Sequence, residues 1–121
     1  MQEIDGIVDG ILRPMEKDGV TVQFQYAEDM AKLPAVTYYV LTESESFRAD
    51  NTEQSQIARV QVDVWTFKRS DMSRISIKVN ELMQSARWMR ELCRDVPKPS
   101  QTEQQCYHRT MRFAKEFWGG E

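Results

Sequence analysis

The sequence predicts an α+β fold, a two-layer sandwich in which an antiparallel sheet carries two helices on one face. Two segments, residues 4–15 and 70–86, repeat apolar side chains at three- and four-residue intervals, the period of an amphipathic helix. The order along the chain is helix, three strands, helix and one or two strands, and 121 residues fit a single domain, 1–121. Four segments alternate with a period of two and predict strands: residues 20–26, 35–42, 56–67 and 104–118.

The first helix should be short because a proline limits it. Its apolar stripe begins at Ile4, and Pro14 lacks the amide hydrogen that a continuing helix needs. We therefore expect the helix to kink or end near Leu12. A turn at Asp18 and Gly19 then leads to the first strand.

The strand at residues 56–67 has the clearest face pattern. Strict alternation indicates one buried face and one wet face, as in an antiparallel sheet that is covered on one side. Arg59 and Asp63 fall on the wet face and are predicted to lie outside the core. The predicted core face consists of Ala58, Val60, Val62 and Val64.

Residues 43–55 are predicted to form a long mobile loop without regular structure. The segment is polar and charged, and Phe47 is its only large apolar residue. Loops of this length in compact domains are usually functional or mobile. The loop is therefore a candidate docking element that orders on binding, and residues 118–121 form a C-terminal tail.

The second helix is predicted to begin at Ser70, a favourable cap, and to run to Ala86. Residues 87–96 fit the helical period and the strand period about equally well. Pro97 and Pro99 end either element. If residues 87–96 form a strand, Cys93 and the Cys106 that follows face one another approximately across a hairpin. An intracellular compartment would keep both thiols reduced.

The sequence offers no catalytic or metal-binding motif, so we expect neither an enzyme nor a cofactor. It contains no nucleotide-binding glycine loop, no metalloprotease helix motif and no nucleophile elbow. His108, Cys93 and Cys106 would give at most three zinc ligands where a structural site needs four. A Cys–His nucleophile pair lacks an orienting partner in the sequence. The acidic residues of the polar loop lack the glycine that a cation-binding turn needs: Glu43, Glu45, Asp50 and Glu53.

Charge and hydropathy exclude further classes. The net charge of −3 argues against a sequence-independent grip on phosphates. No apolar run approaches the roughly 20 residues of a membrane span. The acidic start of the sequence lacks the features of a signal peptide, so an intracellular protein is expected.

Three motifs give the sequence a family resemblance. They are Leu33-Pro34-Ala35-Val36-Thr37-Tyr38-Tyr39, Val62-Asp63-Val64-Trp65-Thr66 and Tyr107-His108-Arg109-Thr110-Met111-Arg112-Phe113. In this order and at this approximate spacing, the chain resembles the tail-terminator, or tail-completion, proteins of long-tailed phages and prophages. The resemblance covers about two-thirds of the chain and favours a strand at residues 87–96. The hairpin at residues 97–101 departs from it, because the family often has an acidic turn with glycine there.

The resemblance implies an assembly function in the virion, with host cytoplasm as the site of assembly. Members of the family form homo-oligomeric rings, commonly hexamers, which dock on the last ring of the tail-tube protein and stop its polymerisation. The ring then joins the tail to the head-completion or connector protein. The resemblance also implies that DNA passes through the lumen without specific binding, which the net negative charge favours.

A ring of this kind needs two different complementary patches on each subunit. Aromatic and charged residues outside the predicted core are the candidate interface residues: Phe47, Arg48, Asp50, Trp65, Phe117 and Trp118. Two alternatives remain open at this point. One is a neighbouring neck protein such as a stopper or connector, and the other is a small cytosolic binding module or an enzyme with a site that no motif marks. A deep pocket with converging polar groups would favour the second alternative.

Overall fold

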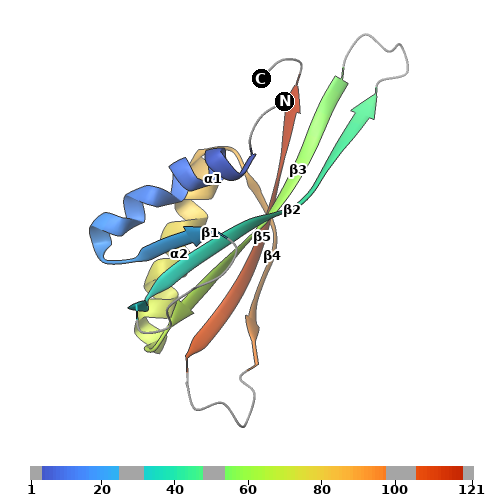
Figure 1. The fold of residues 1–121 in the computed structure, drawn as a ribbon. Helices are drawn as coiled ribbons and strands as arrows, with labels where there is room; N and C mark the ends of the chain where they lie inside the picture. Colours follow the sequence, from blue (N-terminus) through green and yellow to red (C-terminus); the bar gives the residue numbers. More distant parts are fainter. Residues whose placement is uncertain (1–3, 25–31, 48–53, 98–105, 119–121) are drawn as a thin grey trace.

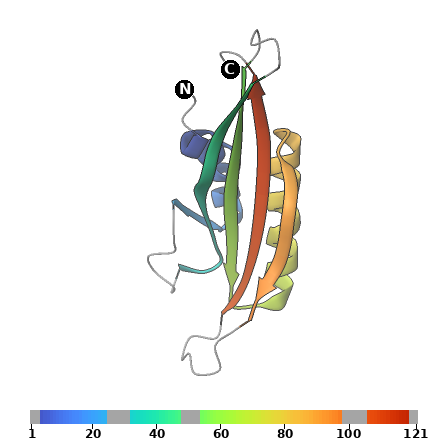
Figure 2. The same cartoon turned by 90° about the vertical axis from the view of Figure 1, so that its right-hand side faces the viewer.

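The chain forms a two-layer α+β sandwich, as predicted (Figure 1). The computed structural model describes residues 4–24, 32–47, 54–97 and 106–118. Both helices lie on one face of a five-stranded sheet, and no described helix covers the other face, here called the outer face (Figure 2). The elements are α1 (Ile4–Leu12), the 3-10 helix η1 (Arg13–Asp18), β1 (Thr21–Phe24), β2 (Ala35–Phe47), β3 (Gln54–Thr66), α2 (Arg69–Ser85), β4 (Met89–Val96) and β5 (Tyr107–Trp118). Residues 87–96 thus contain a strand.

The sheet is mixed, which corrects the prediction of a purely antiparallel sheet. Its spatial order is β1-β2-β3-β5-β4, and every pairing is antiparallel except that of β1 with β2. β1 and β2 are parallel because the ten residues between them, 25–34, return the chain to the end of the sheet from which β1 started. The sequence-based prediction assumed a short link, which would have reversed the direction.

The core lies between the helices and the inner face of the sheet. Ala58, Val60, Val62 and Val64 are fully buried there, so the predicted face of β3 is confirmed. Arg59 is outside the core, as predicted. The largest fully buried side chains of the core come from both the helix layer and the sheet layer: Ile4, Leu12, Met15, Ile75, Met83, Trp88, Met111 and Phe113.

The ends of the helices follow local chemistry. α1 ends at Leu12, where Pro14 was predicted to end it, and the chain continues as η1 to Gly19, whose φ of 80° is a backbone conformation suited to glycine. The predicted cap at Ser70 is wrong, because α2 already begins at Arg69 and Ser70 lies inside it. Extended Lys68 precedes the helix and makes no side-chain cap, and its carbonyl accepts the first helical hydrogen bond, from the amide of Met72.

The predicted loop at residues 43–55 is also corrected. β2 continues to Phe47 and β3 begins at Gln54, and these two residues are register partners. Only residues 48–53 of that segment lie outside the described chain. In Figure 1 the end of β2 and the start of β3 extend past the helix layer. A paired strand needs no apolar residues where no helix covers it, which is why the polar composition resembled that of a loop.

Candidate functional site

A compact group of polar and aromatic side chains lies on the outer face, across the three central strands. The registers place Thr37 opposite Asp63, Asp63 opposite Thr110, and Trp65 opposite His108. Because side chains alternate between the faces of a strand, all of them lie on the same, helix-free face. This sheet-face cluster consists of Thr37, Gln61, Asp63, Trp65, His108 and Thr110.

Asp63 is the centre of the cluster and is only 4% exposed. Its carboxylate lies 2.8 Å from Nε2 of His108 and accepts hydrogen bonds from the Thr110 hydroxyl and, at 3.0 Å, from the Gln61 amide. The prediction that Asp63 stays outside the apolar core holds, but its expected exposure to solvent is wrong. Larger side chains of β3 and β5 cover the short Asp63 side chain, although no described helix lies over this face.

The environment of Asp63 favours its charged form. Burial alone would raise the pKa of this carboxyl group, but the hydrogen bonds from His108, Thr110 and Gln61 outweigh burial and lower the pKa below its ordinary value. A buried carboxylate with several donors is well ordered, since each donor would lose its partner if the carboxylate turned away. Asp63 therefore fixes the position of the side chains around it.

Trp65 and His108 form a stacked pair beside Asp63. Their ring centroids are 3.7 Å apart and their planes differ by 12°. The Trp65 indole nitrogen donates to the Thr37 hydroxyl at 3.0 Å, which links the stack to β2. Trp65 was predicted as an interface residue, and the structure places it half-buried on the outer face with one side of its ring against the imidazole. Hydrogen bonds hold both rings in place, so this part of the face is well ordered.

The His108–Asp63 pair has the geometry of a base and its orienting carboxylate, but the structure records no nucleophile against it. No hydrogen bond joins His108 to Cys93 or Cys106, and no group of three or more metal-ligating side chains occurs in the described residues. An aspartate that orients a histidine supports catalysis only when the other ring nitrogen meets a reacting group.

The two cysteines do not face one another, which corrects that prediction. Cys93 is the register partner of Met111, whereas Cys106 precedes β5 by one residue, five positions from Met111. Five strand residues span about 17 Å, far beyond the reach of a disulfide. The error comes from the register, since Val96 is paired with His108 and the connection between the strands is longer than assumed. Both cysteines are free thiols.

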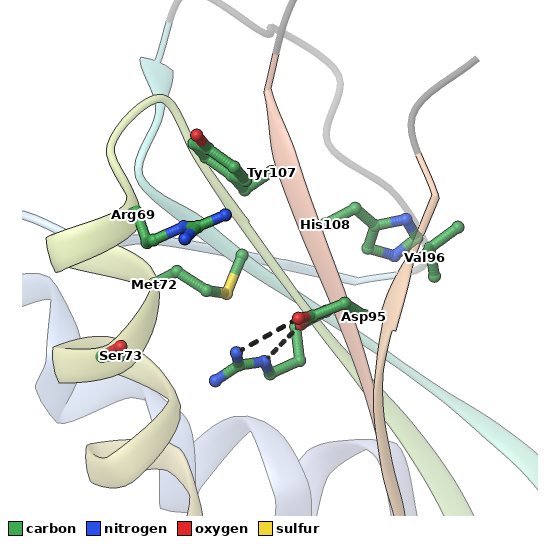
Figure 3. Close-up of a pocket in the computed structure, with 8 residues that line it drawn as sticks. Arg69, Met72, Ser73, Asp95, Val96, Tyr107 and His108 are labelled. Carbon is green, nitrogen blue, oxygen red and sulfur yellow. Dashed lines mark hydrogen bonds and ion pairs between the residues drawn. The ribbon is translucent and has the colours of Figure 1, made fainter. Parts of the chain in front are cut away.

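A cleft of about 570 Å³ lies at one end of the sheet, between the start of α2 and the ends of β4 and β5 (Figure 3). Asp95 and Arg109, which are register partners on β4 and β5, form an ion pair in its lining, with the Arg109 Nε 2.6 Å from the carboxylate, and this contact lowers the pKa of Asp95. The Arg69 guanidinium lies over the Tyr107 ring at 5.8 Å. The charged groups of the cleft are therefore largely engaged with their neighbours. Its lining residues are Arg69, Met72, Ser73, Asp95, Val96, Tyr107, His108 and Arg109.

The other predicted interface residues do not form one patch. Phe117, a predicted interface residue, is only 7% exposed and contacts the core residue Trp88 edge to face at 6.0 Å. Trp118 is half-buried at the end of β5. Phe47 is the last residue of β2, but its side chain lies outside the described part of the structure, as do Arg48 and Asp50 altogether.

Sequence reasoning missed the sheet-face cluster although the sequence contains a signal for it. Asp63 and Trp65 are two residues apart on one strand, and His108 and Thr110 are two residues apart on another. Such pairs share a face whenever the strands are neighbours. What the sequence could not supply was the register that brings β3 beside β5.

No helix in the part of the chain that the structure describes is long and apolar enough to cross a membrane. A comparison with protein-family models found no match, and a search of curated proteins found no matching sequence.

Proposed function

We propose that this protein is a structural, non-enzymatic assembly protein of a long-tailed phage or prophage. It forms a ring at the head-proximal end of the tail, terminates polymerisation of the tail-tube protein and joins the tail to the head-completion or connector protein. DNA passes through the lumen without specific binding. The cytoplasm of the host is the compartment of assembly, and the virion neck is the final location.

The observation that carries this proposal is the convergence of the three motifs behind the family resemblance. They lie far apart in the sequence, on β2, β3 and β5, and supply every member of the sheet-face cluster except Gln61. Thr37 from the first motif bonds to Trp65 from the second, and Asp63 from the second bonds to His108 from the third. Side chains from all three motifs therefore form one ordered surface.

The shape and chemistry of that surface suit assembly. A helix-free sheet face that is ordered and partly aromatic can bind a protein partner with little ordering cost, because its side chains are already fixed. Aromatic residues are also enriched at protein interfaces.

The cleft beside the cluster favours a second candidate, a small binding module. Its volume of about 570 Å³ falls within the range of ligand pockets. However, two of its charged lining residues, Asp95 and Arg109, are already paired with each other, and a charged ligand would have to compete with that ion pair. The assembly function is therefore the better supported of the two.

The test is genetic and uses the parent phage or prophage. Deletion of the gene should give overlong or headless tails together with filled, unattached heads in electron micrographs, and the wild-type gene should restore normal particles. Complementation with Trp65→Ala should restore fewer joined particles than Ile77→Ala, a control on the exposed side of α2, where Ile77 is 60% exposed. Tails of normal length that remain joined to heads in the deletion strain would refute the terminator function.

A further inference from the structure

Among the described residues, strand edges are unpaired at both sides of the sheet. β4 is the last strand in the sheet order, and its outer edge has no partner among the described residues. On the other side, β1 pairs only with residues 35–38 of β2, so the remainder of that strand, residues 39–47, also lacks a described neighbour. Unpaired strand edges present free amide and carbonyl groups and readily accept a further strand.

The strand directions allow one edge to pair with the other in a second copy. β2 and β5 run in the same direction, and β4 runs opposite to both. When two copies join side by side in the same orientation, β4 of one copy therefore meets β2 of the next copy in the antiparallel sense. This contact is heterologous and can be repeated around a ring.

The positions of the two edges along the strand axis are also compatible with a closed ring. Within one sheet, the register partners from β4 through β5 and β3 lead to residues 35–42 of β2. The unpaired part of β2 spans residues 39–47. Pairing them requires an offset between copies of about 15 Å along the strands. Across the roughly 24 Å width of the five strands, that offset corresponds to a tilt of about 30°, close to the strand tilt of closed sheets.

The two edges differ in the sign of their charged residues. Glu91 pairs with Arg59 and Asp95 pairs with Arg109 within the chain, which leaves β4 with two exposed arginines, Arg90 and Arg94, that have no ion-pair partner in the described structure. Residues 39–47 contain two acidic residues and no basic residue. Opposite charges across a contact favour association of these two edges over pairing of like edges.

We propose that the protein self-associates by edge-to-edge strand pairing, in which β4 of one copy joins residues 39–47 of β2 in the next copy. This inference rests on the proposed ring function and specifies its subunit contact. The partner at each of these edges is a second copy of this chain. The contact is made by backbone hydrogen bonds, and opposite charges favour pairing of β4 with β2 over pairing of like edges.

Cys93, an exposed free thiol in β4, permits a direct test in the full-length protein. With Cys106→Ser as background, single cysteines are introduced as Glu43→Cys, Ser44→Cys, Glu45→Cys and Ser46→Cys. The concentrated variants are oxidised and separated on non-reducing gels. We expect ladders that extend beyond dimers, with strong and weak cross-linking alternating along the four positions, because successive residues of a strand face opposite sides. Oxidation traps transient encounters, so a weak contact still accumulates product.

Two controls identify the competing contacts. The background protein with Cys93 alone gives dimers and nothing larger if β4 pairs with β4, and Gln23→Cys gives the ladder if β1 is the true partner. Either result, or the absence of ladders from all four positions, overturns the proposal. Circular dichroism of each variant confirms that it is folded.

Charge reversal supplies a second measurement. Arg90→Glu combined with Arg94→Glu should lower the ladder yield of the Glu45→Cys variant by on the order of tenfold, because attraction becomes repulsion. Reversal of the remaining acidic residue with Glu43→Arg should recover part of that yield. An unchanged yield would show that charge does not select the partner edge.

These outcomes are distinguishable from failure of the proposed function. Abnormal tails in the deletion strain without ladders would mean that the ring uses other contacts. Ladders together with normal tails in the deletion strain would mean that the chain self-associates by its edges but does not terminate tails.

Discussion

The two faces of the sheet are both ordered, but by different means. On the inner face, Val60 and Val62 are fully buried beneath helices and belong to the hydrophobic core. On the outer face, Asp63 is 4% exposed although no described helix covers it, and its order depends on hydrogen bonds and a ring stack. The comparison shows that a sheet can bury a charged residue under its own side chains, and that such a face is polar yet rigid.

The inner face should show the largest effect of a single substitution. Phe113→Ala removes a fully buried ring and should lower the free energy of unfolding by about 3–5 kcal/mol, because it leaves a cavity in close-packed surroundings. Phe67→Ala is the control, since Phe67 is 50% exposed and should change stability by less than about 1 kcal/mol. Urea unfolding followed by circular dichroism measures both. Equal effects would contradict the burial of Phe113 in the core.

The outer face should show an intermediate effect. Asp63→Ala leaves the donors of His108, Thr110 and Gln61 without their acceptor and should destabilise the fold by about 1–3 kcal/mol. Asp95→Ala removes a carboxylate that is 69% exposed and should cost at most about 1 kcal/mol. The same unfolding measurement ranks the two. If Asp95→Ala is the more damaging change, the cluster does not stabilise the outer face.

The smallest effect should be a dependence on pH. Because the pKa of Asp63 is lower in the folded protein than in the unfolded chain, its charged form stabilises the fold above the unfolded value of about 3.9, and that contribution is lost as the pH falls through the lower folded value. The difference in unfolding free energy between the wild type and Asp63→Asn should therefore narrow below about pH 4. A difference that stays constant or widens would contradict this sign.

Sequence periodicity predicted the fold well wherever burial alone decides the pattern. The inner residues of β3 and the end of α1 at Leu12 follow directly from alternation and from proline chemistry. The errors arose where long-range pairing decides. The parallel pairing of β1, the extension of β2 to Phe47 and the cover over Asp63 all depend on which strands become neighbours. The local sequence of a strand does not determine which other strand becomes its neighbour.

The position of β5 has a consequence for folding order. It is the last strand along the chain, yet it lies between β3 and β4 and is the only described strand that pairs with β4. While the chain is being synthesised, the β2–β3 hairpin can form first, but β4 has no neighbour until residues 107–118 are available. The contacts of β3 with β5 join segments that are distant in sequence, and such contacts form slowly. An unfinished chain would therefore expose β3 as an unprotected edge, and protection from aggregation would begin only when β5 is inserted.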